Sequence, residues 1–124
     1  MQTVCELSLF EHAAEQAGMT AEEVEELIEF LSLHPSAGDA IEGSGGCRKL
    51  RFPGRGKGKS GGYRAVTFYS GQDIPVYLIT VFSKGERSNL SKRERNALAE
   101  LTRTLKAEYR DRVVTVKVKR RDRA

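Results

Sequence analysis

The stretch Pro75-Val-Tyr-Leu-Ile-Thr-Val-Phe-Ser83 decides the fold. Its apolar side chains fall on both parities of an extended chain, whereas a strand with one wet face alternates apolar and polar residues. We therefore predict a central β-strand that is covered on both faces or nearly so. The run is far shorter than the roughly 20 apolar residues of a membrane-spanning helix, so we expect no membrane association.

Other strands are predicted on the N-terminal side of this run. Cys47–Phe52 is a candidate strand, and Gly62–Ser70 is rich in β-branched and aromatic residues. Short connections between these strands and the central one favour an antiparallel three-strand meander. Thr3–Leu9 alternates well enough to add a short N-terminal strand.

Two helices are predicted between the first strand and the meander. Phe10–Gly18 reads as a short helix closed by glycine. A stronger helix begins at a capping-box pair, Thr20 and Glu23, and ends at His34–Pro35. Its many glutamates are typical of a solvated face and do not suggest catalytic carboxylates.

A last helix follows the central strand. Ser91 and Glu94 form a second capping box, and leucines at helical spacing predict a helix to about Tyr109. Beyond it, Val113–Lys119 alternates valine with Thr or Lys, so residues 110–124 form a basic extension that is either an edge strand or a tail.

Together these elements predict an α+β fold. We expect a mainly antiparallel sheet, made of the meander and the N-terminal strand, with the helices packed on one face and the other face open for binding. A chain of 124 residues suits one domain, here residues 1–109 followed by the extension.

Charge is strongly segregated along the chain. Residues 1–42 contain ten acidic and no basic side chains, whereas residues 43–72 contain seven basic and no acidic ones. The centre of the basic part is Arg51-Phe-Pro-Gly-Arg-Gly-Lys-Gly-Lys-Ser-Gly-Gly-Tyr-Arg64. Glycine lets backbone and cations approach phosphates closely, so this segment is a candidate RNA-binding hairpin.

Nucleotide-binding motifs do not explain these glycines. Gly56, Gly58 and Gly61 have dinucleotide-fingerprint spacing, but that motif requires a helix after it, and here a strand follows. Gly58-Lys59-Ser60 resembles the end of a P-loop, yet Pro53 stands where that motif has glycine. We expect no nucleotide cofactor.

The cysteines and histidines do not form a metal-binding pattern. Cys5 and Cys47 lie far apart, and His12 and His34 have no ligand spacing relative to them. Reduced, mostly buried thiols are expected, together with no metal. The N-terminus lacks a basic region ahead of an apolar stretch, so a cytoplasmic location is expected.

Several segments resemble the RelE/ParE superfamily of bacterial toxins, most closely its HigB-type branch. The matching segments are Phe30–Pro35, Gly38–Ile41, Gly45–Phe52, Gly58–Val66 and Ile79–Ser88. The most specific part is the Ser-Gly-Gly-x-Arg step into a strand, and the resemblance covers residues 3–108.

The resemblance implies a compact microbial RNase fold and cleavage of mRNA in the ribosomal A site, without metal or cofactor. It also implies neutralisation by a cognate antitoxin, in this branch usually a helix-turn-helix protein of the HigA type. The implied reaction is attack of the ribose 2′-OH on the adjacent phosphorus, with cations doing most of the catalytic work.

Candidate roles follow from that chemistry. Arg64 suits the scissile phosphate because a guanidinium matches two phosphate oxygens. Lys57 or Lys59 is the candidate base or charge stabiliser, and Lys84 the candidate acid or second stabiliser. The candidate RNA-binding residues are Arg48, Lys49, Arg51, Arg55 and Arg87, of which Arg87 could also act at the phosphate.

Two other functions fit the same residues. A ParE-like toxin of this fold would poison DNA gyrase without cutting RNA, although the lysine-rich loop and Lys84 argue against it. A non-catalytic RNA- or ribosome-binding module is the other alternative. The chain also departs from several relatives, which carry tyrosine or histidine near the start of the last helix, where this chain has Leu90.

Overall fold

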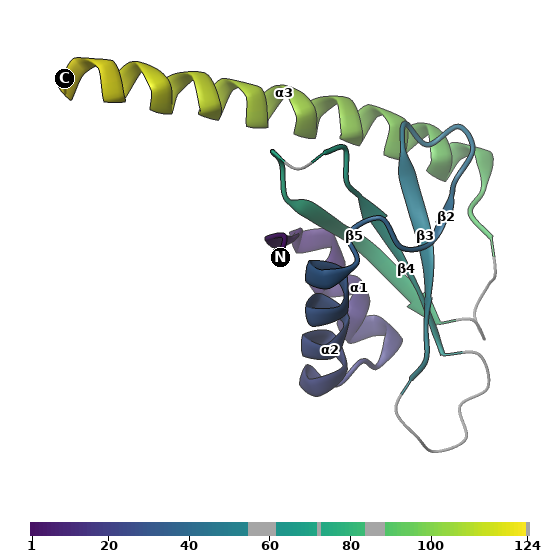
Figure 1. Cartoon of the computed structure of the whole chain (residues 1–124). Coiled ribbons are helices and arrows are strands. Elements are labelled where there is room, and N and C mark those ends of the chain that lie inside the picture. Colours follow the sequence, from purple (N-terminus) through teal and green to yellow (C-terminus); the bar gives the residue numbers. More distant parts are fainter. Residues whose placement is uncertain (55–61, 72, 84–88, 124) are drawn as a thin grey trace.

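The computed structural model describes residues 1–54, 62–71, 73–83 and 89–123, with side chains up to Tyr109 in the last helix. Along the chain the elements are β1 (Val4–Glu6), α1 (Ser8–Ala17), α2 (Ala21–Leu33), β2 (Asp39–Ala40), β3 (Cys47–Phe52), β4 (Tyr63–Phe68), β5 (Val76–Ser83) and α3 (Lys92–Arg123). Figure 1 shows these elements around one twisted sheet.

The sheet has five strands in the order β1-β5-β4-β3-β2. β3, β4 and β5 form the predicted antiparallel meander, and the N-terminal strand joins its edge by pairing parallel to β5. At the other edge, β2 pairs with β3. No strand was predicted for the two-residue β2.

β5 confirms the prediction made from its apolar run. Val76, Leu78 and Val81 belong to a core cluster on one face of the sheet, whereas Ile79 and Phe82 belong to a second cluster on the other face. The strand is therefore buried on both faces.

Helices cover both faces of the sheet, so the expectation that they pack on one face was wrong. The first core cluster joins Phe10 of α1 and Leu27 of α2 to the sheet. The second cluster joins Leu98 and Leu105 of α3 to the opposite face, and Figure 1 shows α3 on the far side of the sheet from α1 and α2. An open face would leave the apolar side chains of that face in water, which costs free energy in proportion to the exposed area.

α3 approaches the sheet at the turn between β2 and β3. Gly45 has a φ of 78°, and a Cβ there would lie 2.4 Å from Thr102 Oγ1. Any larger residue would push α3 away from the sheet, so glycine allows the close contact.

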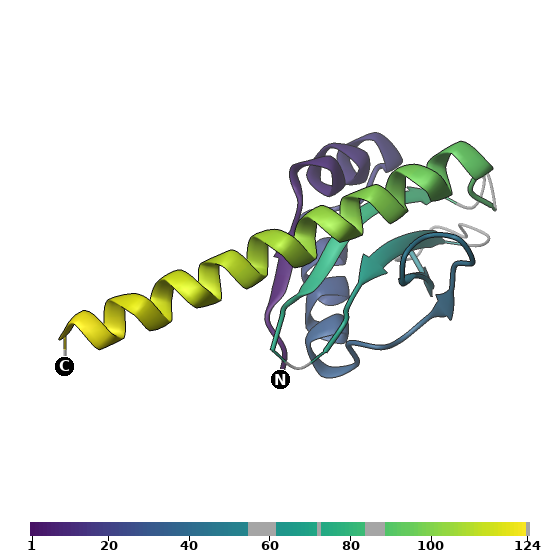
Figure 2. The same cartoon turned by 90° about the horizontal axis from the view of Figure 1, so that it is seen from above.

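α3 also runs further than predicted. It continues to Arg123, so the basic extension after Tyr109 is helical and does not form an edge strand. β-branched residues lower helix stability only slightly, and no glycine or proline interrupts the sequence from Lys92 to Arg123. Figure 2 shows its C-terminal part projecting beyond the body of the molecule. Among the described residues, no helix has both the length and the apolar character needed to cross a bilayer.

Both predicted capping boxes are present. Thr20 Oγ1 accepts from the Glu23 amide at 3.1 Å, and Glu23 Oε1 accepts from the Thr20 amide at 2.9 Å. Ser91 and Glu94 make the same pair of bonds at the start of α3.

Candidate functional site

Three basic residues share the α3-side face of the sheet. Arg51 of β3 lies directly opposite Arg64 of β4, and Lys49, two residues earlier in β3, lies opposite Val66. Val66 belongs to the core on the α3 side, and residues two apart in a strand share a face, so all three basic side chains leave the sheet on that side. We call Lys49, Arg51 and Arg64 the cation row.

The centre of the cation row places like charges against each other. Directly opposed side chains in an antiparallel pair have Cβ atoms about 4.5–5.5 Å apart, and like charges there are destabilising. Two guanidinium groups facing one space are typical of a site for an anion with several oxygens, because each group can donate two parallel hydrogen bonds.

Arg64 is the most buried member of the row, at 7% exposure. Its Nη1 donates to the carbonyl oxygen of Tyr63 at 3.5 Å. Phe82 lies opposite it on β5 and belongs to the α3-side core. Apolar surroundings strengthen the interaction of this guanidinium with an anion, because less water screens the charge.

Arg48 is not part of the row. It alternates with Lys49 along β3 and therefore leaves the sheet on the α1–α2 side. Its Nη1 donates to the Gly38 carbonyl at 3.2 Å, which ties β3 to the chain before β2. The structure therefore separates Arg48 from the other candidate RNA-binding residues that it describes.

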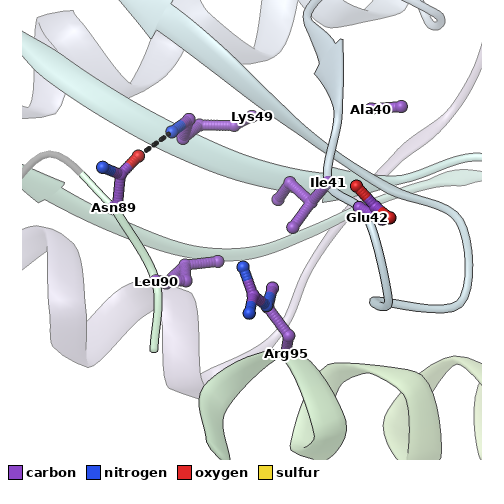
Figure 3. Close-up of a pocket in the computed structure, with 7 residues that line it drawn as sticks. All are labelled: Ala40, Ile41, Glu42, Lys49, Asn89, Leu90 and Arg95. Carbon is purple, nitrogen blue, oxygen red and sulfur yellow. Dashed lines mark hydrogen bonds between the residues drawn. The ribbon is translucent and has the colours of Figure 1, made fainter. Parts of the chain in front are cut away.

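A cavity of about 310 Å³ adjoins Lys49. Lys49 Nζ donates to Asn89 Oδ1 at 3.1 Å. Figure 3 shows Ile41, Leu90 and Arg95 directed toward the same space, with that hydrogen bond on one side of it. The residues lining the cavity are Ala40, Ile41, Glu42, Lys49, Asn89, Leu90 and Arg95.

Most of this lining was not predicted from the sequence. Asn89 and Arg95 flank a capping box, and Glu42 lies in a turn, so no local pattern marks any of them as a site residue. They meet only because α3 begins beside β2 and β3. The one lining residue that the sequence did propose for RNA binding is Lys49.

The proposed residues Lys57, Lys59, Lys84, Arg55 and Arg87 lie outside the described residues. The segments that carry them nevertheless begin at one end of the sheet. Phe52, Tyr63 and Ser83 pair across β3, β4 and β5, immediately beside Arg51 and Arg64. Both segments therefore leave the sheet at the end where the two arginines are opposed.

The chemistry available to the described part of the site is that of fixed positive charge. A guanidinium group donates hydrogen bonds and accepts none, so Arg51 and Arg64 can hold an anion and stabilise developing negative charge. In the portion of the chain that the structure describes, no group of three or more His, Cys, Asp or Glu side chains could hold a metal ion.

The thiol of Cys47 is a core group on the same face of the sheet. It is fully buried, and burial raises its pKa from 9.0 to about 11, while a hydrogen bond with Ser44 acts in the opposite direction. A thiol that stays protonated is a poor nucleophile. We therefore assign Cys47 to packing.

Comparison with known families covers nearly the whole chain. Residues 4–121 match the family described as "RelE toxin of RelE / RelB toxin-antitoxin system". The match extends past residue 108, where the resemblance seen in the sequence ended, and so includes most of the C-terminal part of α3. The sheet, the helices and the cation row therefore belong to a member of the RelE family, the toxin of a type II toxin-antitoxin system.

Proposed function

We propose that this toxin is a ribosome-dependent mRNA endoribonuclease of the HigB-type branch. RelE toxins are typically mRNA interferases that act on the ribosome. The observation that carries the proposal is the direct opposition of Arg51 and Arg64 on one face of the sheet. An RNA phosphate between them would relieve their repulsion and supply the oxygens that guanidinium groups bind best.

The proposed reaction begins with the ribose 2′-oxygen, which attacks the neighbouring phosphorus as its proton passes to a base. The bond from phosphorus to the 5′-oxygen then breaks, and an acid protonates that oxygen, leaving a 2′,3′-cyclic phosphate. Arg64 holds the scissile phosphate and stabilises the extra negative charge of the transition state. Lys57 or Lys59 is the proposed base, since neighbouring cations lower the pKa of a lysine, and Lys84 is the proposed acid.

Lys49 extends the phosphate path toward the cavity beside Asn89. It lies two residues from Arg51, about 7 Å along the strand, which suits the next nucleotide of a single-stranded message. The apolar side chains of Ile41 and Leu90 and the amide of Asn89 suit an unstacked base. Leu90 offers an aliphatic contact where several relatives have a ring.

A cognate antitoxin is the proposed protein partner. RelE toxins pair with RelB-type antitoxins, and for this chain we propose a helix-turn-helix protein of the HigA type. The measurement is to purify the toxin with the product of a neighbouring reading frame and determine the complex mass. A partner of another class would reject the HigA assignment while leaving the RNase proposal intact.

The main test replaces the phosphate-binding arginine. Arg64→Ala should lower cleavage of ribosome-bound mRNA at least about a hundredfold, because it removes a preorganised donor to the transition state. Arg64→Lys keeps the positive charge but loses the planar fork of the guanidinium, so its activity should lie between those of the wild type and Arg64→Ala. Arg103→Ala is the matched control, since Arg103 is exposed on α3.

Mapping of mRNA 5′ ends after induction gives the readout. New cuts within translated messages, lost in Arg64→Ala but kept in Arg103→Ala, would support the proposal. DNA breaks with intact mRNA would replace it by the gyrase-poisoning alternative. Ribosome binding without cuts or breaks would leave an RNA-binding module.

A further inference from the structure

A buried carboxylate lies beneath the strand that carries Arg64. Glu23 is 4% exposed, although it belongs to the first turn of a helix rich in solvated glutamates. Its Oε1 accepts from the Thr20 amide at 2.9 Å and from the Tyr63 hydroxyl at 3.1 Å. The second bond joins residues 40 positions apart and links α2 to the first residue of β4.

Tyr63 connects the start of β4 with both the α1–α2 core and Arg64. It opens β4, its ring packs against the α1–α2 core, and its carbonyl accepts from Arg64. Its side chain and that of Arg64 leave the strand on opposite faces of the sheet. A displacement of Tyr63 would therefore move the backbone from which the Arg64 side chain starts.

Glu23 and Tyr63 also lie beside the neck of the basic hairpin, by which we mean residues 52–54 and 62. A Cβ placed on Gly54 would lie 3.2 Å from Tyr63 Cε2 and 3.5 Å from Glu23 Oε2. Gly62 has a φ of 56°, and a Cβ there would lie 2.5 Å from the Phe52 carbonyl oxygen. The two chain segments of the neck therefore touch each other and rest on the Tyr63–Glu23 pair.

We propose that Glu23 and Tyr63 are positioning residues, which fix the neck of the basic hairpin and thereby hold Arg64 in the arrangement that the reaction requires. The effect on catalysis rests on the proposed RNase function. The anchoring of the neck rests only on the contacts described above. Neither residue touches RNA in this scheme, because both lie on the α1–α2 side of the sheet.

The chemistry of the pair suits a permanent anchor. Burial raises the pKa of Tyr63 above 10.0, and the neighbouring Glu23 raises it further through its charge and its hydrogen bond. The phenol therefore stays a donor throughout the neutral range. A hydrogen bond to a charged group is stronger than one between neutral groups, and its loss leaves a buried acceptor.

The test compares variants that separate anchoring from helix capping. Tyr63→Phe removes only the hydroxyl and should lower kcat for ribosome-bound mRNA roughly three- to tenfold, with KM unchanged. Thr20→Ala is the matched control, because it removes the other capping-box acceptor of α2 and keeps the Tyr63 bond. It should lower Tm and leave kcat as in the wild type.

Variants of Glu23 test whether the hydrogen bond between Glu23 and Tyr63 is itself responsible for the effect. Glu23→Gln keeps a carbonyl acceptor and should retain most of kcat, whereas Glu23→Ala should lose as much as Tyr63→Phe. The double variant Glu23→Ala/Tyr63→Phe should lose no more than either single variant, because both remove the same bond.

Limited trypsin digestion gives a readout that does not depend on RNA cleavage. The segment between the two sides of the neck contains Arg55, Lys57 and Lys59. Cutting there should be several-fold faster in Tyr63→Phe and Glu23→Ala than in Thr20→Ala. Wild-type digestion in Tyr63→Phe would overturn the anchoring, and faster digestion with wild-type kcat would overturn the positioning role.

The two proposals fail separately. If the wild-type toxin cuts no mRNA, the proposed RNase function fails, and the digestion rates still decide whether the pair anchors the neck.

Discussion

The two faces of the sheet differ in what they leave to solvent. On the α1–α2 face, the core runs from Val76 of β5 to Leu50 of β3 and is closed by Phe10 and Leu27. On the α3 face, a core around Phe68 is followed along the strands by the cation row. The same strands thus build two different faces. We call the α1–α2 side, which is all core, the closed face, and the α3 side, which is shared between core and cation row, the divided face.

This difference shows how a small domain combines stability with a cluster of like charges on one face of its sheet. In β3, Leu50 and Phe52 point toward the α1–α2 core, while Lys49 and Arg51 alternate with them on the other face. Apolar burial on one side of the strand offsets the repulsion between cations on the other side. Substitutions on the two faces should therefore have different consequences.

The largest effect on stability is expected on the closed face. Phe10→Ala should lower the free energy of unfolding by about 3–5 kcal/mol, because Phe10 is fully buried and its removal leaves a cavity. Urea denaturation measures the change. The neighbouring Leu9→Ala is the control, since Leu9 is 55% exposed and should change stability by less than about 0.5 kcal/mol. Equal effects in both variants would mean that Phe10 does not close this core.

An intermediate effect is expected from the buried thiol on the divided face. Cys47 keeps its proton in the folded state up to about pH 11, whereas in the unfolded chain it titrates near 9.0. The unfolded state therefore binds fewer protons in this window, and stability should fall as pH rises from 9 to 11, by at most about 1.4 kcal/mol per pH unit. Below pH 9 both states are protonated, so this contribution should not vary.

The Cys47 effect can be isolated by comparing variants. Denaturation of the wild type and of Cys47→Ala at pH 8, 9, 10 and 11 should give a steeper decline in the wild type. Parallel slopes in the wild type and Cys47→Ala would contradict the assignment.

Much of the fold could be predicted from the sequence because its signals are local. Capping boxes fix the starts of α2 and α3 within a few residues of chain, and the apolar run of β5 reports burial on both faces. The placement of α3 opposite α1 and α2 was not predicted, because amphipathic helices do not encode which face of a sheet they cover. The helical course of α3 past Tyr109 was also missed. The alternating valines there favour a strand, but this preference is weak where no glycine or proline interrupts the preceding helix.

The site was predictable only in part. The charge pattern identified Lys49, Arg51 and Arg64, which the structure brings onto one face. The cavity lined by Asn89 and Arg95 depends on contact between segments about 40 residues apart, which no sequence spacing reports. The same holds for the bond between Glu23 and Tyr63, because the capping-box sequence is the same whether or not the glutamate oxygen also accepts from a distant phenol.

The smallest expected effect concerns the repulsion inside the cation row. Arg51→Gln should raise the free energy of unfolding by roughly 0.2–1 kcal/mol at low salt, because Arg51 opposes Arg64 directly and like charges in that position are unfavourable. The gain should shrink toward zero in 1 M salt, where the screening length falls to about 3 Å. Arg93→Gln provides a control, since Arg93 is exposed on α3.

The same Arg51→Gln variant should weaken ribosome binding and flatten its salt dependence, because one phosphate contact is lost. A variant that is more stable yet binds RNA less well is the expected signature of charges kept for a ligand. If Arg51→Gln were instead less stable at every salt concentration, Arg51 would contribute to packing, and the divided face would be held together in the same way as the closed one.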